Sequence, residues 1–133
     1  MEKTPTESIA LPTKEIILER LESLPKKIMH QETEIQKTSD SISEQDFQAK
    51  LIKNQAALDI FKEKDIEDKP IYKNEMHREM ELSKRLSLNE YHQGIMGKMN
   101  KNMALLKEQQ IYHEFLKNRF SAAKYISKLI GGE

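Results

Sequence analysis

The sequence of 133 residues contains no cysteine and no tryptophan, and only four glycines and four prolines. The lack of cysteine excludes disulfide scaffolds, cysteine-based zinc sites and thiol catalysis. No apolar run approaches the roughly 18 residues that a membrane-spanning helix needs, so we expect no membrane contact. The N-terminus lacks the apolar core of a secretory signal, which predicts a cytoplasmic protein.

The residues that are present favour helices. Charged residues make up 33% of the chain, and glutamate, lysine, glutamine and leucine are frequent while glycine and proline are scarce. The length fits one domain. We therefore predict an all-α fold, an elongated helical bundle or helical hairpin with coiled-coil-like seams. A flexible arm at 1–12 would precede a single helical domain at 13–133, made of a helical half at 13–63, a loop at 64–72 and a second helical half at 73–130.

The strongest pattern is an apolar stripe in the first half, which we call the first stripe. Four of its members are seven residues apart, and the other two occupy the second position of the same heptad. The first stripe consists of Ile17, Leu21, Leu24, Ile28, Ile35 and Ile42. The second heptad position continues with Gln31, Thr38 and Gln45, so this seam is half polar. It is our candidate surface for homo-oligomerisation, with parallel and antiparallel pairing both open.

Two features interrupt this first half. A proline inside a helix removes a backbone hydrogen bond, so Pro25 predicts either a kink or a break. We favour a break, with one helix ending near Ser23 and the next having Pro25 in its first turn. The polar cluster at 38–43 predicts a turn or a weak point, and Ser43 with Asp46 imitates a capping box.

A second apolar stripe follows the polar cluster. Phe47, Leu51, Leu58 and Phe61 have the spacing of one buried helix face, with Asn54 in the remaining slot. We call these four residues the second stripe. Alternating charges and Pro70 then predict the loop at 64–72.

The second helical half begins at Asn74, which is a suitable N-cap. The S-x-x-E pattern from Ser87 to Glu90 is a capping box, so we predict a new helix from about residue 88. It would continue to Ile130 and stop at the glycines 131–132. Gly94 and Gly97, three residues apart, would weaken its start or allow another helix to approach closely.

Charge is unevenly distributed although the 22 basic and 22 acidic residues balance. The acidic residues outnumber the basic ones in the first half, and basic residues prevail at 98–128. Basic residues interleaved with aromatics are a candidate face for nucleic acid or for a protein partner. This basic set consists of Lys98, Lys101, Lys107, Lys117, Arg119, Lys124, Tyr125 and Lys128.

Motifs that carry chemistry are lacking. The sequence has no phosphate-binding glycine loop, no dinucleotide fingerprint and no nucleophile elbow. His77 and Glu81 are four residues apart, but a metal site needs three or four ligands. We therefore predict no enzyme, no catalytic residues, no cofactor, no metal and no small-molecule substrate.

The layout of residues 70–130 is familiar. A loop with Lys73-Asn74 leads to a helix with Arg78, Leu82 and Leu86, then to Asn89-Glu90-Tyr91 and a long helix that ends in the run 115–124, FLKNRFSAAK. This layout resembles small helical proteins from the early replication and recombination gene clusters of phages and prophages of Gram-positive bacteria. The resemblance implies an accessory to a recombinase, a single-strand-binding protein or a nuclease, in a bacterial host cell. It implies no catalytic residues.

Three functional hypotheses follow. The first is a non-enzymatic helical module that forms homo-oligomers and binds a protein partner, as an accessory factor in phage DNA metabolism. The second is direct binding of single-stranded or duplex DNA through the basic set. The third is a phage inhibitor of a host enzyme or defence system, whose acidic run at 59–68 would mimic a phosphate backbone.

Overall fold

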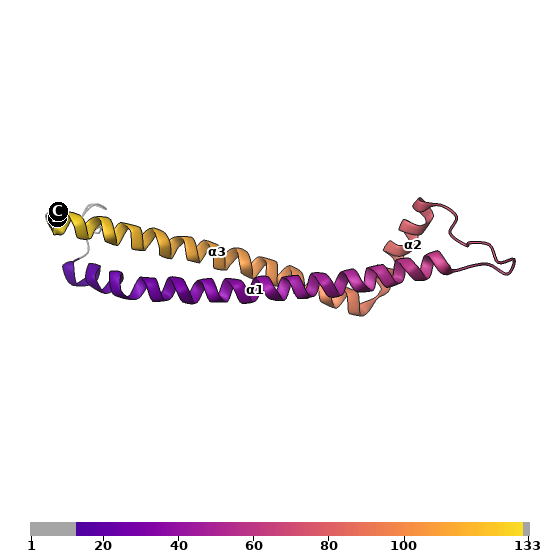
Figure 1. Ribbon diagram of the computed structural model, residues 1–133, viewed down its shortest axis with the longest axis horizontal. Coiled ribbons are helices and arrows are strands. Elements are labelled where there is room, and N and C mark those ends of the chain that lie inside the picture. The colour runs from indigo at the N-terminus through magenta and orange to yellow at the C-terminus, as the bar shows by residue number, and fades with distance from the viewer. Residues whose placement is uncertain (1–12, 132–133) are drawn as a thin grey trace, which may run out of the picture. The chain divides into compact units, whose positions relative to one another are not determined.

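The computed structural model describes residues 13–131, and the predicted arm at 1–12 lies outside them. The described chain forms three helices: α1 (Lys14–Lys62), α2 (Glu75–Leu88) and α3 (Glu90–Ile130) (Figure 1). Within the described range the only β-type pairing is a single bridge between Lys64 and Pro70. The all-α fold of packed helices is thus confirmed.

The chain divides into two compact units. In the first, residues 13–35 of α1 pack against the C-terminal part of α3 from Glu108 onward. Its core is made by Ile17 and Leu24 from α1 with Leu116 and Ala123 from α3, all at most 4% exposed. Both pairs are seven residues apart, as a heptad seam requires.

The second unit, Gln36–Lys107, contains the rest of α1, the connecting segment, α2 and the first part of α3. Its buried apolar residues are Ala49, Ile60 and Ile95, and it also buries Thr38 and His92. This core contains smaller and more polar side chains than that of the first unit.

The predicted break at Pro25 is wrong, because α1 is one continuous helix that contains this proline. The helix begins where the sequence indicates, since Thr13 Oγ1 accepts a hydrogen bond from the backbone N–H of Ile16 at 3.3 Å. Pro25 cannot donate to the carbonyl four residues earlier. The buried Leu24 and the half-buried Ile28 anchor the helix on both sides of this lost bond, so packing outweighs its cost.

The polar cluster at 38–43 does not form a turn either, and no helix begins at Ser43. Thr38 lies in the buried seam at 8% exposure. The half-buried Ile42 is one turn further along the same side. The helix continues because this polar segment still presents one packed face.

The second stripe is the largest departure from prediction. Phe47, Leu51, Leu58 and Phe61 are all exposed, at 45–68%. The face that packs is made instead by Ala49, Ile52, Ala56 and Ile60, which are buried or half-buried. At 100° per residue these two sets lie on opposite sides of α1.

The predicted loop is confirmed at 64–72, within a non-helical segment that extends from 63 to 74. The Asp65 carboxylate organises it by accepting hydrogen bonds from the backbone N–H groups of Glu67 and Lys69, both at 2.9 Å. Asp68 has a positive φ of 62°, a conformation that aspartate tolerates better than most residues. Asn74 then caps α2 as predicted, its side chain accepting from the N–H of His77 at 2.8 Å.

The junction between α2 and α3 differs from the predicted capping box. Ser87 lies inside the last turn of α2, where its hydroxyl donates to the carbonyl of Lys84. The residue between the helices is Asn89, whose Oδ1 accepts from the N–H of His92 at 2.9 Å. Asparagine therefore caps α3, two residues after the serine that the pattern selected.

The glycine predictions have mixed outcomes. A Cβ at Gly94 or Gly97 would meet nothing within 4 Å, so neither glycine makes room for another described helix. Gly131 follows the end of α3, and its N–H bonds to the carbonyl of Ser127, as predicted for a helix stop.

Candidate interaction surfaces

The first stripe is packed within the chain itself. Ile17 and Leu24 are buried, and Leu21, Ile28, Ile35 and Ile42 are half-buried. In the unit that contains most of the stripe, the covering helix is the C-terminal part of α3. Within that unit the packing partner of the stripe is therefore another helix of the same chain, and four of its six side chains stay partly exposed.

Polar pairs occupy parts of this seam. In the first unit Gln31 Nε2 donates to the carbonyl of Gln109 at 3.4 Å, and Glu32 Oε1 lies 3.1 Å from His113 Nε2. In the second unit Asn102 Nδ2 donates to Gln45 Oε1 at 3.1 Å. Polar pairs in a coiled-coil seam fix its register at a cost in stability. Sequence reasoning found Gln31 and Gln45 of α1 but missed their α3 partners Gln109 and Asn102, which are seven residues apart.

All eight members of the basic set are exposed, but they do not form one face. Lys117 and Lys124 are seven apart and share a side of α3. Arg119 lies about 160° away from Lys117 around the helix at 100° per residue. Lys117 also pairs with Glu114 at 3.1 Å, and Lys124 Nζ lies over the Phe120 ring at 4.7 Å. The cations are spread around the helix, and several already contact neighbouring side chains.

A stack of side chains stands on the exposed surface of α3. The Tyr112 and Phe115 rings are 6.2 Å apart at an interplanar angle of 20°, and the Arg119 guanidinium lies 5.8 Å from the centre of the Phe115 ring. Both rings are about half exposed. Tyrosine, phenylalanine and arginine are enriched at protein interfaces, and stacked aromatics beside a cation also suit unpaired bases.

The stack belongs to a longer apolar stripe. The positions of this stripe are separated by three and four residues in turn, and Arg119 fills the one polar position. The same spacing is found in a coiled-coil seam. This C-terminal stripe consists of Tyr112, Phe115, Ala122, Ile126 and Leu129. Ile126 is half-buried and the other four are exposed. It was not predicted as a separate surface, although the three-four spacing was readable in the sequence.

In the second unit Arg85 of α2 binds Glu63, the residue that directly follows α1. Its Nη2 donates to Glu63 Oε2 at 2.7 Å and its Nε to Glu81 Oε1 at 2.9 Å. The hydrogen bond from Arg85 is the main cause that lowers the pKa of Glu81, and the bond to Glu63 is the main cause that raises the pKa of Arg85. The Tyr72 hydroxyl lies 3.5 Å from the same Nη2. Both carboxylates of this cluster are paired with the one guanidinium, which fits a structural role.

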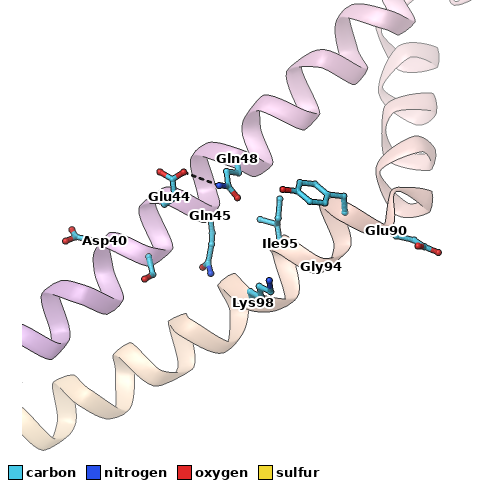
Figure 2. Close-up of a pocket in the computed structure, with 10 residues that line it drawn as sticks. Asp40, Glu44, Gln45, Gln48, Glu90, Gly94, Ile95 and Lys98 are labelled. Carbon is cyan, nitrogen blue, oxygen red and sulfur yellow. Dashed lines mark hydrogen bonds between the residues drawn. The ribbon is translucent and has the colours of Figure 1, made fainter.

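A groove of about 600 Å³ lies between α1 and the start of α3 in the second unit. Figure 2 shows Gln45 of α1 and Lys98 of α3 extending into it, while Asp40 and Glu90 lie at opposite ends. Glu44 is engaged by Gln48, whose Nε2 donates to it at 3.1 Å. The three carboxylates do not converge on one point, so the groove has no geometry for a specific cation.

The acidic run at 59–68 is partly neutralised by its own lysines. Lys64 lies 3.7 Å from Asp68, and Lys69, just beyond the run, lies 3.4 Å from Glu67. Asp65 uses its carboxylate to hold the loop backbone. These interactions leave little of a continuous negative surface.

Between residues 13 and 131 there is no cluster of three or more histidine, aspartate or glutamate side chains able to hold a metal ion. No helix in that range is long and apolar enough to cross a bilayer. Comparison of the chain with protein-family models, with curated proteins and with solved structures finds no match.

Proposed function

We propose that the chain is a non-enzymatic helical interaction module, which forms oligomers and binds a helical protein partner. The observation that carries this proposal is the C-terminal stripe. Its large side chains Tyr112, Phe115 and Leu129 are 48–64% exposed, although Leu116 and Ala123 on an adjacent side of α3 are buried. Exposed large apolar side chains gathered on one side of a helix mark an interaction surface.

The partner chemistry follows from the shape of the stripe. An amphipathic helix binds such a surface through apolar side chains at positions i, i+3, i+4 and i+7. Arg119 in the middle of the stripe favours an acidic residue at the matching position of the partner. The resemblance of residues 70–130 to phage replication and recombination proteins suggests an accessory role in DNA metabolism.

Matched variants test this proposal. Phe115→Asp places a charge in the C-terminal stripe, whereas Ser121→Asp adds the same charge at an exposed position about 120° away around the helix. We expect a protein partner captured from bacterial extract to be retained by the wild type and by Ser121→Asp, and lost by Phe115→Asp. Equal capture by all three proteins would exclude the stripe as the binding surface.

Binding of single-stranded DNA is the second candidate, favoured by the exposed stack of Tyr112, Phe115 and Arg119. It is measured by fluorescence anisotropy of labelled DNA at low and near-physiological salt. Binding through cations weakens steeply with salt because counterions are released. The proposal of a protein partner predicts no binding at near-physiological salt; binding that persists there and is lost in a variant with Lys117, Arg119 and Lys124 changed to glutamate would favour DNA.

A further inference from the structure

The order of residue types in the second stripe is nearly the same from either end. From the N-terminal end its order is Phe47, Leu51, Asn54, and from the C-terminal end it is Phe61, Leu58, Asn54. Phe47 and Leu51 precede Asn54 by seven and three residues, and Leu58 and Phe61 follow it by four and seven residues. A twofold-symmetric interface requires such self-complementarity, because the same surface must meet itself.

The stripe is exposed over its whole length. Phe47 is 58% and Phe61 68% exposed, with the two leucines at about half. The opposite side of α1 is already occupied, since Ala49 and Ile60 are buried there. Internal packing thus uses one face of this segment and leaves the larger side chains in solvent.

We propose that α1 pairs with α1 of a second copy through the second stripe, antiparallel, with the twofold axis at Asn54. This pairing deepens the oligomerisation part of the proposed function and rests on it. Phe47 then meets the partner's Phe61, and Leu51 meets the partner's Leu58. The two Asn54 side chains face each other and can exchange amide hydrogen bonds, a device that fixes register in coiled coils.

The charges beside the stripe are compatible with this arrangement. In antiparallel pairing Lys50 lies opposite the partner's Ala57, and Gln48 lies opposite the partner's Lys62. Gln55 lies opposite the partner's Gln55. No two like charges are brought together, and Lys50 is also neutralised by Asp46 of its own helix at 2.7 Å.

The position of α2 favours antiparallel over parallel pairing. Arg78 of α2 lies 5.7 Å from the centre of the Phe61 ring, so α2 stands beside that end of the stripe. Parallel pairing would bring both α2 helices to the same end. Antiparallel pairing places each α2 beside the partner's Phe47, which is 58% exposed.

The area is sufficient for a dimer that depends on concentration. Two phenylalanines and two leucines at this exposure present roughly 400 Å² of apolar surface, within the range of the largest patch on a monomer. With the flanking side chains of both copies, the interface would bury on the order of 1,000 Å², the lower limit for a specific contact.

Cysteine cross-linking tests the geometry, because the chain has no cysteine of its own. Asn54→Cys should oxidise to a disulfide-linked dimer at least ten times faster than Lys53→Cys, an exposed neighbour that lies about 100° away on the helix. Phe47→Cys mixed in equal amounts with Phe61→Cys should give the mixed dimer in a larger excess over each homodimer than random pairing of the two variants produces. Circular dichroism checks that each variant keeps its helix content.

Other outcomes would overturn the proposal. Equal rates for Asn54→Cys and Lys53→Cys mean that the axis does not lie at Asn54, and preferred homodimers of Phe47→Cys mean parallel pairing. The proposed function is judged separately. If cross-linking fails at position 54 while Phe115→Asp still loses its partner, the stripe on α1 is wrong and the interaction module stands.

Discussion

The two apolar stripes of α1 have the same helical spacing but differ in burial. The first stripe is buried or half-buried within the chain, whereas the second stripe is exposed to solvent. The first was predicted as a seam for homo-oligomerisation and the second as a buried face. Periodicity identifies a helix face that can pack. Another helix of the chain must lie against that face before the face is buried within the chain.

The physical reason lies on the other side of the helix. Between residues 44 and 62, α1 carries two stripes, one with large side chains and one with Ala49, Ile52, Ala56 and Ile60. Alanines allow close approach of a neighbouring helix, and Ile60 fills the remaining space at 1% exposure. Hydrophobicity alone favours the face with two phenylalanines, so the sequence reading selected the wrong one.

A matched pair of leucine substitutions gives the largest expected contrast. Leu24→Ala removes a buried side chain of the first stripe and should lower the free energy of unfolding by about 2–5 kcal/mol. Leu51→Ala in the second stripe should change it by less than about 0.5 kcal/mol in dilute solution. Urea unfolding followed by circular dichroism measures both, and equal losses would contradict the assignment of the two faces.

Pro25 tests whether the first stripe holds one continuous helix. Pro25→Ala restores a backbone donor in the middle of α1. We expect stabilisation of about 1–2 kcal/mol, because the gain of a helix-forming residue is partly offset by the roughly 0.4–1 kcal/mol that proline contributes through the unfolded state. A destabilised variant in the same urea assay would indicate that the helix breaks at this residue.

A smaller difference in stability is expected between two substitutions at the start of α3, one at the observed cap and one at the predicted cap. Asn89→Ala removes the side chain that accepts from His92 N–H and should cost about 1 kcal/mol. Ser87→Ala, at the residue that the capping-box pattern selects, should cost less than about 0.5 kcal/mol. The reverse order in thermal unfolding would restore the serine as the cap.

The smallest effect concerns pH. The pKa of Glu81 is lowered below its ordinary value of 4.5, mainly by the hydrogen bond from Arg85. Its contribution to stability is therefore complete above the ordinary value and is lost as the pH falls through the lowered one. Glu81→Gln should reduce stability more at pH 7 than at pH 3, whereas a difference that is independent of pH would exclude this ion pair as its source.

Much of the fold was accessible from composition and local signals. The helical class, the start of α1 at Thr13, the loop at 64–72 and the Asn74 cap all depend on residues close in sequence. The continuity of α1 through Pro25 and 38–43 was not accessible, because tertiary packing overrides local propensity there. The basic set was predicted as one candidate face, and its scatter around α3 appears only when each residue is assigned to a helix position.

Sedimentation equilibrium over a range of concentrations tests most directly whether the second stripe is an intermolecular face. The wild type should change from the mass of one 15.6 kDa chain to that of two as concentration rises. Leu51→Lys should remain at one chain with unchanged helix content, since a charge is placed in an exposed stripe. A wild type that stays at one chain at every concentration, or a variant that dimerises equally well, would contradict the account.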